Sequence, residues 1–186
     1  MTRTWFLLPV CVAVAVAVFA GCGGGKGGAD IATAKPGELT YDQMRDMPDG
    51  KRMVYERDFY AREDLASTEY ETLEALEWLK ADNHKGGEVS KADLQKTVED
   101  FYDAGAKKVY VTGIAVFKPE DFGMKPADEE QAKGVHVSDT LIVEMPDEPE
   151  KRKTVIEFAA KWFLEYYEEE YSTEDFGQQY IQIQFG

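Results

Sequence analysis

Cysteine and histidine are scarce in this sequence, whose 186 residues contain only two of each. Both cysteines, Cys11 and Cys22, precede the bulk of the chain. The remainder therefore has no disulfide framework, no cysteine nucleophile and no cysteine-ligated metal site. Basic residues are also few, since 21 Lys and Arg stand against 36 Asp and Glu and give a net charge of −15. A surface this acidic repels nucleic acid, so we expect no nucleic-acid partner.

Spacings that organise catalysis or metal binding are missing as well. His84 and His136 belong to no HExxH or HxH pattern. His136 and Ser138 fall on the same face of an expected strand, which by itself is weak support for a base–nucleophile pair. The acidic runs at residues 128–130 and 168–170 lack the alternating pattern of a calcium loop. We therefore predict structural histidines and solvated acidic runs, with no catalytic residue, metal or cofactor; weak cation binding by these runs is the alternative.

The first 22 residues, in contrast, carry a specific pattern. A positive start at Arg3 is followed by an uncharged stretch over residues 6–19, which is too short for a typical membrane-spanning helix of about 20 residues. Residues 19–22 read FAGC, which resembles the lipobox of bacterial lipoproteins with phenylalanine in place of the commoner leucine. The resemblance implies that residues 1–21 are a signal peptide and that Cys22 receives a lipid anchor.

Lipidation at Cys22 places the mature protein in the cell envelope, anchored to a membrane and facing the periplasm or the outside. Secretion without a lipid and an uncleaved N-terminal helix are the alternatives. Residues 23–28 read GGGKGG and lack the Ser or Thr that follows the lysine of a phosphate-binding loop, so they predict a flexible tether. We therefore divide the chain into a signal peptide at 1–21, a tether and polar lead-in at 22–50, and one domain at 51–186.

Hydrophobic spacing predicts three helices in this domain. Thr68 and Glu71 form a capping box for a helix that ends near residue 82. Ser90 caps a second helix, and a glycine at position 105 is suited to end it. The third helix starts near Pro149, a residue favoured in a first helical turn, and runs to about residue 171.

Strands are predicted where β-branched and aromatic residues gather, at residues 107–117, 137–145 and 179–185. A further short strand is expected at 51–57 or 88–89. The resulting order is β-α-β-β-α-β with an extra N-terminal helix. We therefore expect an α+β fold, specifically a ferredoxin-like split β-α-β-β-α-β sandwich.

Three segments of the domain resemble known sequences. Residues 101–114, 139–146 and 177–180 look like uncharacterised bacterial α+β domains with "LYxAGAxxVxV" and "DTLxVxLP" signatures. The helix–AGA–strand part is also similar to the ribonuclease E regulator B family. That regulator acts in the cytoplasm, whereas this chain carries an export signal, so its function is not transferred.

The last predicted strand holds the best candidate for partner binding. Apolar residues there alternate with Tyr180, Gln182 and Gln184, so one face packs on helices and the other faces solvent or a partner. At a sheet edge, such a strand can pair with another chain. We therefore predict a membrane-anchored, non-catalytic protein-interaction module. The alternatives are an envelope enzyme with a carboxylate-based site and a lipoprotein that binds a small ligand or a metal.

Overall fold

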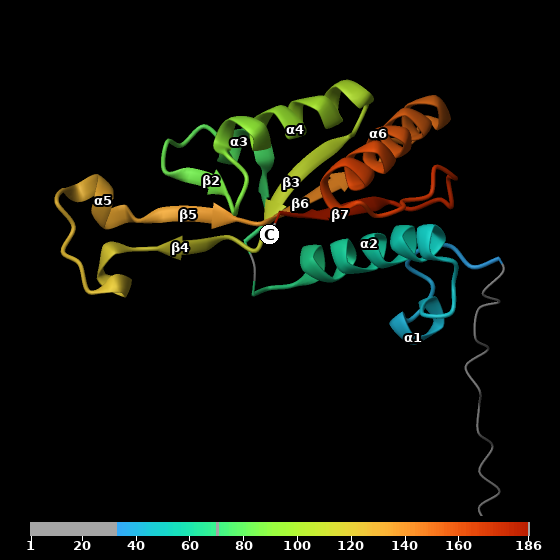
Figure 1. Cartoon of the computed structure of the whole chain (residues 1–186), viewed down its shortest axis with the longest axis horizontal. Helices are drawn as coiled ribbons and strands as arrows, with labels where there is room; N and C mark the ends of the chain where they lie inside the picture. The colour runs from blue at the N-terminus through green and yellow to red at the C-terminus, as the bar shows by residue number, and fades with distance from the viewer. Residues whose placement is uncertain (1–32, 70, 186) are drawn as a thin grey trace, which may run out of the picture.

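The computed structural model describes residues 33–69 and 71–185, which form an α+β domain with six α-helices, a 3-10 helix and two small sheets (Figure 1). The helices are α1 (Tyr41–Met44), α2 (Asp49–Ala66), α3 (Ala75–Trp78), α4 (Lys91–Ala104), η1 (Pro119–Phe122), α5 (Glu129–Lys133) and α6 (Pro149–Tyr167). The strands are β1 (Leu73–Glu74), β2 (His84–Gly86), β3 (Lys108–Thr112), β4 (Ala115–Phe117), β5 (Val135–Ser138), β6 (Thr140–Glu144) and β7 (Tyr180–Gln184).

The core sheet has four antiparallel strands in the order β1-β3-β6-β7. Its register aligns Val109 with Val143 and Val143 with Ile181, so these side chains share one face. All three are fully buried and belong to the same hydrophobic cluster as the inner residues of α4 and α6. Figure 1 shows both helices above this face. The apolar period of two in the strands therefore determines which face receives the helices.

Helix α2 lies on the other side of β7 from α6 (Figure 1) and makes many contacts with that strand. Gln182 points to this side, is only 3% exposed, and donates its side-chain amide to Asp64 Oδ2 at 2.6 Å. The expectation that the polar face of the last strand is open to solvent is therefore wrong at Gln182. The physical reason is that α2 forms a second helical layer on this side of β7.

Asp58 attaches α2 to the start of β7. Its side chain is completely buried, and Oδ1 accepts the backbone N–H groups of Gln179 and Tyr180 at 2.7 and 2.8 Å. Oδ2 accepts from Arg62 Nε at 2.6 Å. Because a buried carboxylate is costly unless it is paired and hydrogen-bonded, these contacts define how the helix sits on the strand. Asp58 also occupies donors that an incoming strand would otherwise use.

The N-terminal part of the domain differs from expectation. Residues 51–57, predicted as a short strand or loop, lie inside α2. The helix predicted from Thr68 to about residue 82 is reduced to α3, because Leu73 and Glu74 pair with β3 instead. Tertiary pairing overrides the local helical spacing here.

The helices predicted near Ser90 and Pro149 are confirmed. The Ser90 side chain accepts the N–H of Asp93 at the start of α4, and Gly105 ends that helix with φ 106°. Pro149 lies in the first turn of α6, but the helix ends at Tyr167, a turn earlier than predicted. Local capping chemistry was sufficient to place both helix starts.

The two long predicted strands are each broken in the structure. The first divides at Gly113, where φ is 65°, into β3 and β4; the second divides at Asp139 into β5 and β6. The outer halves form a second sheet in the order β2-β5-β4, with β2 parallel to β5 and β4 antiparallel to it. This sheet, with η1 and α5, projects from the domain (Figure 1) and is called the wing below.

The four strands of the core sheet and the helices α4 and α6 follow one another in the chain as β1-α4-β3-β6-α6-β7, which is the predicted β-α-β-β-α-β order. These strands, however, are neighbours in chain order and antiparallel. Within the described sheet, no strand lies between β1 and β3. The ferredoxin-like split arrangement is therefore not shown, and the supported description is an α+β domain with two small sheets.

Candidate functional site

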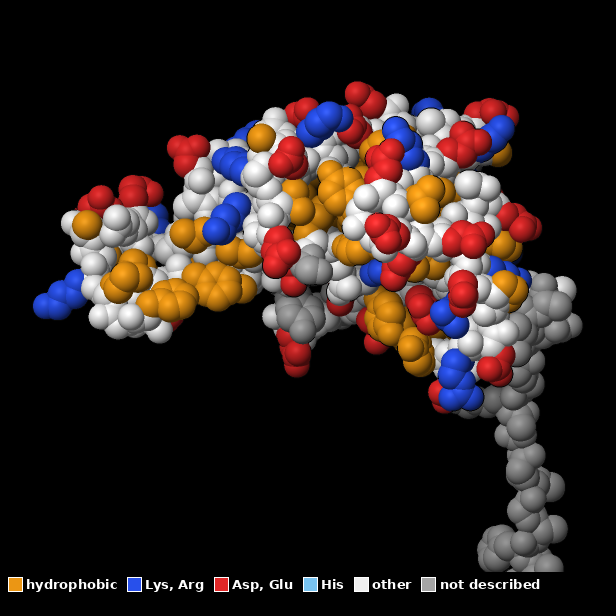
Figure 2. Space-filling view, in the orientation of Figure 1, with side chains coloured by type: hydrophobic (Ala, Val, Ile, Leu, Met, Phe, Trp, Pro, Cys, Tyr) orange, Lys and Arg blue, Asp and Glu red, His pale blue; other side chains and the backbone are white. Residues whose placement is uncertain are grey.

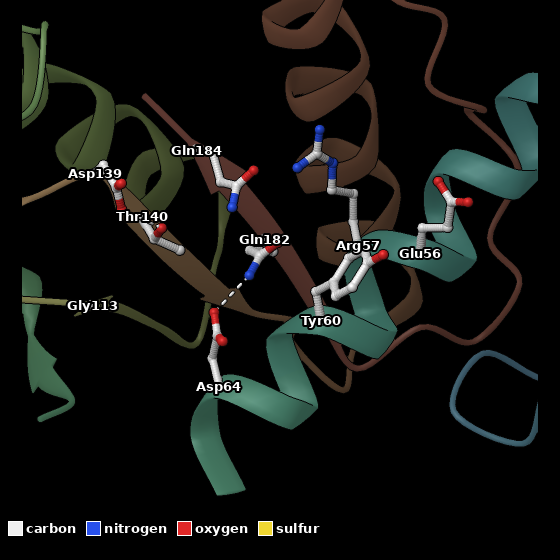
Figure 3. Close-up of a pocket in the computed structure, with 9 residues that line it drawn as sticks. All are labelled: Glu56, Arg57, Tyr60, Asp64, Gly113, Asp139, Thr140, Gln182 and Gln184. Atoms are coloured by element: carbon white, nitrogen blue, oxygen red, sulfur yellow. Dashed lines mark hydrogen bonds between the residues drawn. The ribbon is translucent and has the colours of Figure 1, made fainter. Parts of the chain in front are cut away.

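Two hollows mark the surface of the described residues. The first, of about 580 Å³, lies between α2 and the core sheet (Figure 3). It is lined mainly by polar side chains from α2, from β7 and from the break between β5 and β6. The lining residues are Glu56, Arg57, Tyr60, Asp64, Gly113, Asp139, Thr140, Gln182 and Gln184.

The polar groups of this hollow are largely occupied with protein partners. Asp64 accepts from Gln182, and the Asp139 carboxylate accepts from Thr140 Oγ1 at 2.7 Å. Arg57 is directed to the Phe163 ring at 5.2 Å and to Glu169 at 3.9 Å. Burial raises the pKa of Asp64, and the charge of Asp139 raises it further, while the Gln182 hydrogen bond opposes the shift. Asp64 is thus a carboxylate in the hollow whose charged form is disfavoured.

The second hollow, of about 1290 Å³, lies on the wing and is called the wing groove. Apolar side chains of β4, η1, the loop after η1, and β5 line it and remain open to solvent (Figure 2). Phe122 is 64% exposed, Met124 57% and Phe117 47%. Exposed apolar side chains gathered around one hollow can form an interaction site.

Lysines surround the apolar part of the wing groove. The basic residues that line it are Lys85, Lys118, Lys125 and Lys133. The acidic residues that line it are Asp82 and Glu130, and Glu130 forms an ion pair with Lys133. The groove therefore has an excess of positive charge on a chain whose net charge is −15.

Specific contacts give the wing a defined structure. Gly134 has φ 79°, and a Cβ there would lie 2.7 Å from the Phe117 carbonyl oxygen, so only glycine fits between α5 and β4. Asn83 Nδ2 donates to the Gly134 carbonyl at 3.0 Å and joins the turn before β2 to the wing. The Asp128 side chain accepts the N–H of Gln131 and caps α5. Close backbone packing and capping hold the walls of the groove.

The histidines lie in a ring stack in the wing sheet. His84 stacks on Trp78 with ring centroids 4.7 Å apart, and His136 lies 4.6 Å from His84. His84 Nδ1 is 2.6 Å from the Trp78 carbonyl oxygen. Burial and the neighbouring His84 lower the pKa of His136, which favours its uncharged form. Within residues 33–69 and 71–185, no three His, Cys, Asp or Glu side chains converge on a possible metal position.

The structure separates the predicted site residues. Gln182 and Gln184 line the polar hollow, whereas Tyr180 packs under the Arg62 guanidinium at 5.6 Å. Strand β7 is at an edge of the described sheet. Cys22, the predicted signal peptide and the start of the predicted tether lie outside the described residues.

The sequence alone does not predict the wing groove. A signal was present, because Phe122 and Met124 are apolar residues in an otherwise polar segment that also contains Lys118, Lys125 and Lys133. Nothing in their spacing, however, places them opposite the apolar residues of β4 and β5.

No helix among the described residues has the length and apolar character needed to cross a bilayer. The chain matches no known protein-family model, no curated protein and no solved structure.

Proposed function

We propose that this protein is a membrane-anchored envelope lipoprotein that acts by binding another protein, with the wing groove as its contact surface. The observation that carries the proposal is the exposure of Phe117, Phe122 and Met124 around one hollow. Exposed aromatic and methionine side chains are typical of protein contact surfaces. The polar hollow fits this role less well, since its side chains already pair with one another.

The placement of the wing suits a tethered protein. In Figure 1, α1, which follows the tether predicted from the sequence, lies at the opposite end of the domain from the wing. An anchor at Cys22 with a flexible link would leave the wing groove directed away from the attachment point. Anchoring at one end and binding at the other is the arrangement that we propose.

Anchoring is tested by the mass of the mature N-terminus after expression in a bacterium. The expected result is an acylated N-terminal Cys22 and recovery of the protein with membranes. Cys22→Ala is expected to abolish the acylation. An unmodified N-terminus, or retention of the first residue, contradicts the lipoprotein assignment.

Binding through the wing is tested by capture of partners from bacterial envelopes with the full-length protein. The variant carries Phe122→Asp and Met124→Asp, which change exposed side chains. The matched control is Leu164→Asp on α6, whose side chain is 62% exposed and lies outside the groove. We expect a specific partner to be lost with the wing variant and retained with the control. Equal recovery from both removes the wing groove as the contact surface.

A second candidate function belongs to the polar hollow. Asp64 and Asp139 line it together, and the pKa of Asp64 is raised, as in many acid–base or ligand sites. A small cationic ligand, a metal or a carboxylate-based reaction would use these two groups. Thermal stabilisation by calcium that disappears in Asp64→Asn would favour this candidate, whereas no stabilisation by calcium leaves it without a metal role.

A further inference from the structure

We infer that the wing groove binds an extended, acidic polypeptide segment in which apolar side chains alternate with carboxylates. This inference rests on the proposed function and adds the chemistry of the partner. Three properties of the groove lead to it: an apolar sheet face, an excess of lysines, and an adjacent strand edge.

The floor of the groove is one face of the wing sheet. The register aligns Phe117 with Val135, and it aligns Lys85 and Ala115 with Val137. Because side chains on a strand alternate between faces, these residues lie together on one side. The opposite side carries His84 and His136, whose tilted rings lie 4.6 Å apart. A ligand on the open face therefore meets valine and phenylalanine, and alternate apolar side chains of a strand match that spacing.

The charge of the groove selects an acidic ligand. Lys118 and Lys125 line the groove without an ion pair among the described residues, and Lys85 stands on the sheet face itself. Several exposed lysines elsewhere are paired, as Lys161 is with Glu165 on α6. Carboxylates that approach the apolar floor would lie beside unpaired ammonium groups. Complementary charge of this kind determines specificity and speeds association.

The adjacent edge favours a polypeptide over a lipid surface. Within the described sheet, β4 pairs with β5 on one side and with no strand on the other. All three of its residues are exposed. An extended peptide can use the free backbone groups of such an edge, whereas lipid headgroups form no ladder and a bilayer is too flat to fill a hollow. The short edge, followed at once by Lys118 and Pro119, limits pairing to a few residues.

The test measures binding of short fluorescent peptides to the full-length lipoprotein in nanodiscs of uncharged phosphatidylcholine. In one peptide, glutamates alternate with valine and phenylalanine; in the second, glutamines replace the glutamates. Vesicles of phosphatidylglycerol are the third probe. We expect the acidic peptide to bind at least about tenfold more tightly than the glutamine peptide, with a preference that falls between 0.1 and 1 M salt, as the screening length drops from about 10 to about 3 Å.

Two triple variants with the same change in net charge locate the effect. The wing variant replaces Lys118, Lys125 and Lys133 by glutamine. The control variant replaces Lys96, Lys153 and Lys161, which are exposed on α4 and α6. The wing variant is expected to lose most of the preference for the acidic peptide, and the control variant is expected to retain it.

Several outcomes would overturn the inference. Equal binding of both peptides removes the charge selection, and equal loss in both variants removes the location. Binding of phosphatidylglycerol vesicles in place of the peptide assigns the groove to a membrane surface. Self-association that depends on the wing lysines assigns it to a second copy of the chain. Failure of every probe rejects the acidic segment, while envelope capture that still depends on Phe122 and Met124 leaves the proposed function standing.

Discussion

The core sheet and the wing share two stretches of sequence, β3–β4 and β5–β6, yet they differ in burial. Of the five residues of β6, four are buried, whereas all three residues of β4 are exposed. Strand β3 continues past Gly113 into β4, and β5 continues past Asp139 into β6. The comparison teaches that β-propensity determines where a strand forms, while the helices packed around it determine whether the strand stabilises the fold or remains open for binding.

Helices account for this difference. The core sheet lies between α4 and α6 on one side and α2 along β7 on the other (Figure 1). The wing sheet approaches the domain through Gly86, where an added Cβ would lie 3.2 Å from Leu94 of α4. The face of the wing sheet that carries Phe117, Val135 and Val137 lines the wing groove. The two regions are therefore expected to respond differently to the same kind of change.

The largest effect is expected where the second helical layer joins the core sheet. Asp58→Ala removes the acceptor of two backbone N–H groups and leaves Arg62 without its carboxylate. Breaking such a buried network should lower the free energy of unfolding by about 3–5 kcal/mol. Urea denaturation measures it, with exposed Glu63→Ala on the same helix as the control. Equal stability of the two variants would show that α2 does not depend on this carboxylate.

The same substitution in both sheets tests the comparison directly. Val143 on β6 is fully buried, whereas Val116 on β4 is 41% exposed. We expect Val143→Ala to cost about 2 kcal/mol, from lost burial and the cavity left behind, and Val116→Ala to cost less than about 0.5 kcal/mol. Urea denaturation of both variants gives the values. A cost at Val116 equal to that at Val143 would contradict the exposure of the wing.

A change at Gly134 should affect the wing alone. Gly134→Ala forces a Cβ towards the Phe117 carbonyl in a backbone conformation that is essentially restricted to glycine. We expect a local strain of about 1–3 kcal/mol, seen as faster hydrogen exchange of the β5 amides with little change in the exchange of β6. Gly123→Ala is the control for the positive φ, because a Cβ there meets no atom within 4 Å. Parallel loss of protection in β6 would mean that the wing and the core unfold together.

The smallest effect concerns pH. Arg152 donates to both Asp175 oxygens at 2.7 Å and lowers the pKa of that carboxyl. Stabilisation by a lowered pKa is complete above the unfolded value of about 3.9 and is lost as pH falls through the folded value. Because Asp175 is more than one-third exposed, the contribution should be below about 1 kcal/mol.

Comparison of pH 7 with pH 3 in urea denaturation measures this contribution. Asp175→Asn should reduce the acid-induced loss of stability. Glu130→Gln, which changes an exposed pair in the wing, should leave that loss unchanged. An unaltered pH dependence in Asp175→Asn would show that the ion pair near β7 is as weak as the one in the wing.

The sequence was a good guide where local chemistry alone defines an element. Ser90 and Gly105 mark the two ends of α4, as predicted, and Pro149 is at the start of α6. The same approach missed α2, in which half of the residues are charged and no clear apolar stripe is present. Ion pairs within that helix, such as Arg52 with Asp49, and its packing along β7 stabilise it. The contacts with β7 join residues far apart in the chain and leave no local pattern.

The candidate binding surface was also only partly predictable from the sequence. Exposed apolar and basic residues at 117–133 were visible in the sequence as composition, but their common groove depends on the register of β4 with β5 and on the turn at Gly134. Gln182, predicted to face a partner, is instead covered because Asp64 reaches it from α2.

Composition and contacts within a few residues are enough to predict the acidic surface, the cysteine-free domain, the capped helices α4 and α6, and the presence of strands in three segments. The places where the long strands break, the half of each that enters the core, and the apolar side chains that stay exposed follow from the packing of the whole domain. Those outcomes depend on whether helices distant in sequence cover a given sheet face, and burial is a property of that arrangement rather than of any one segment.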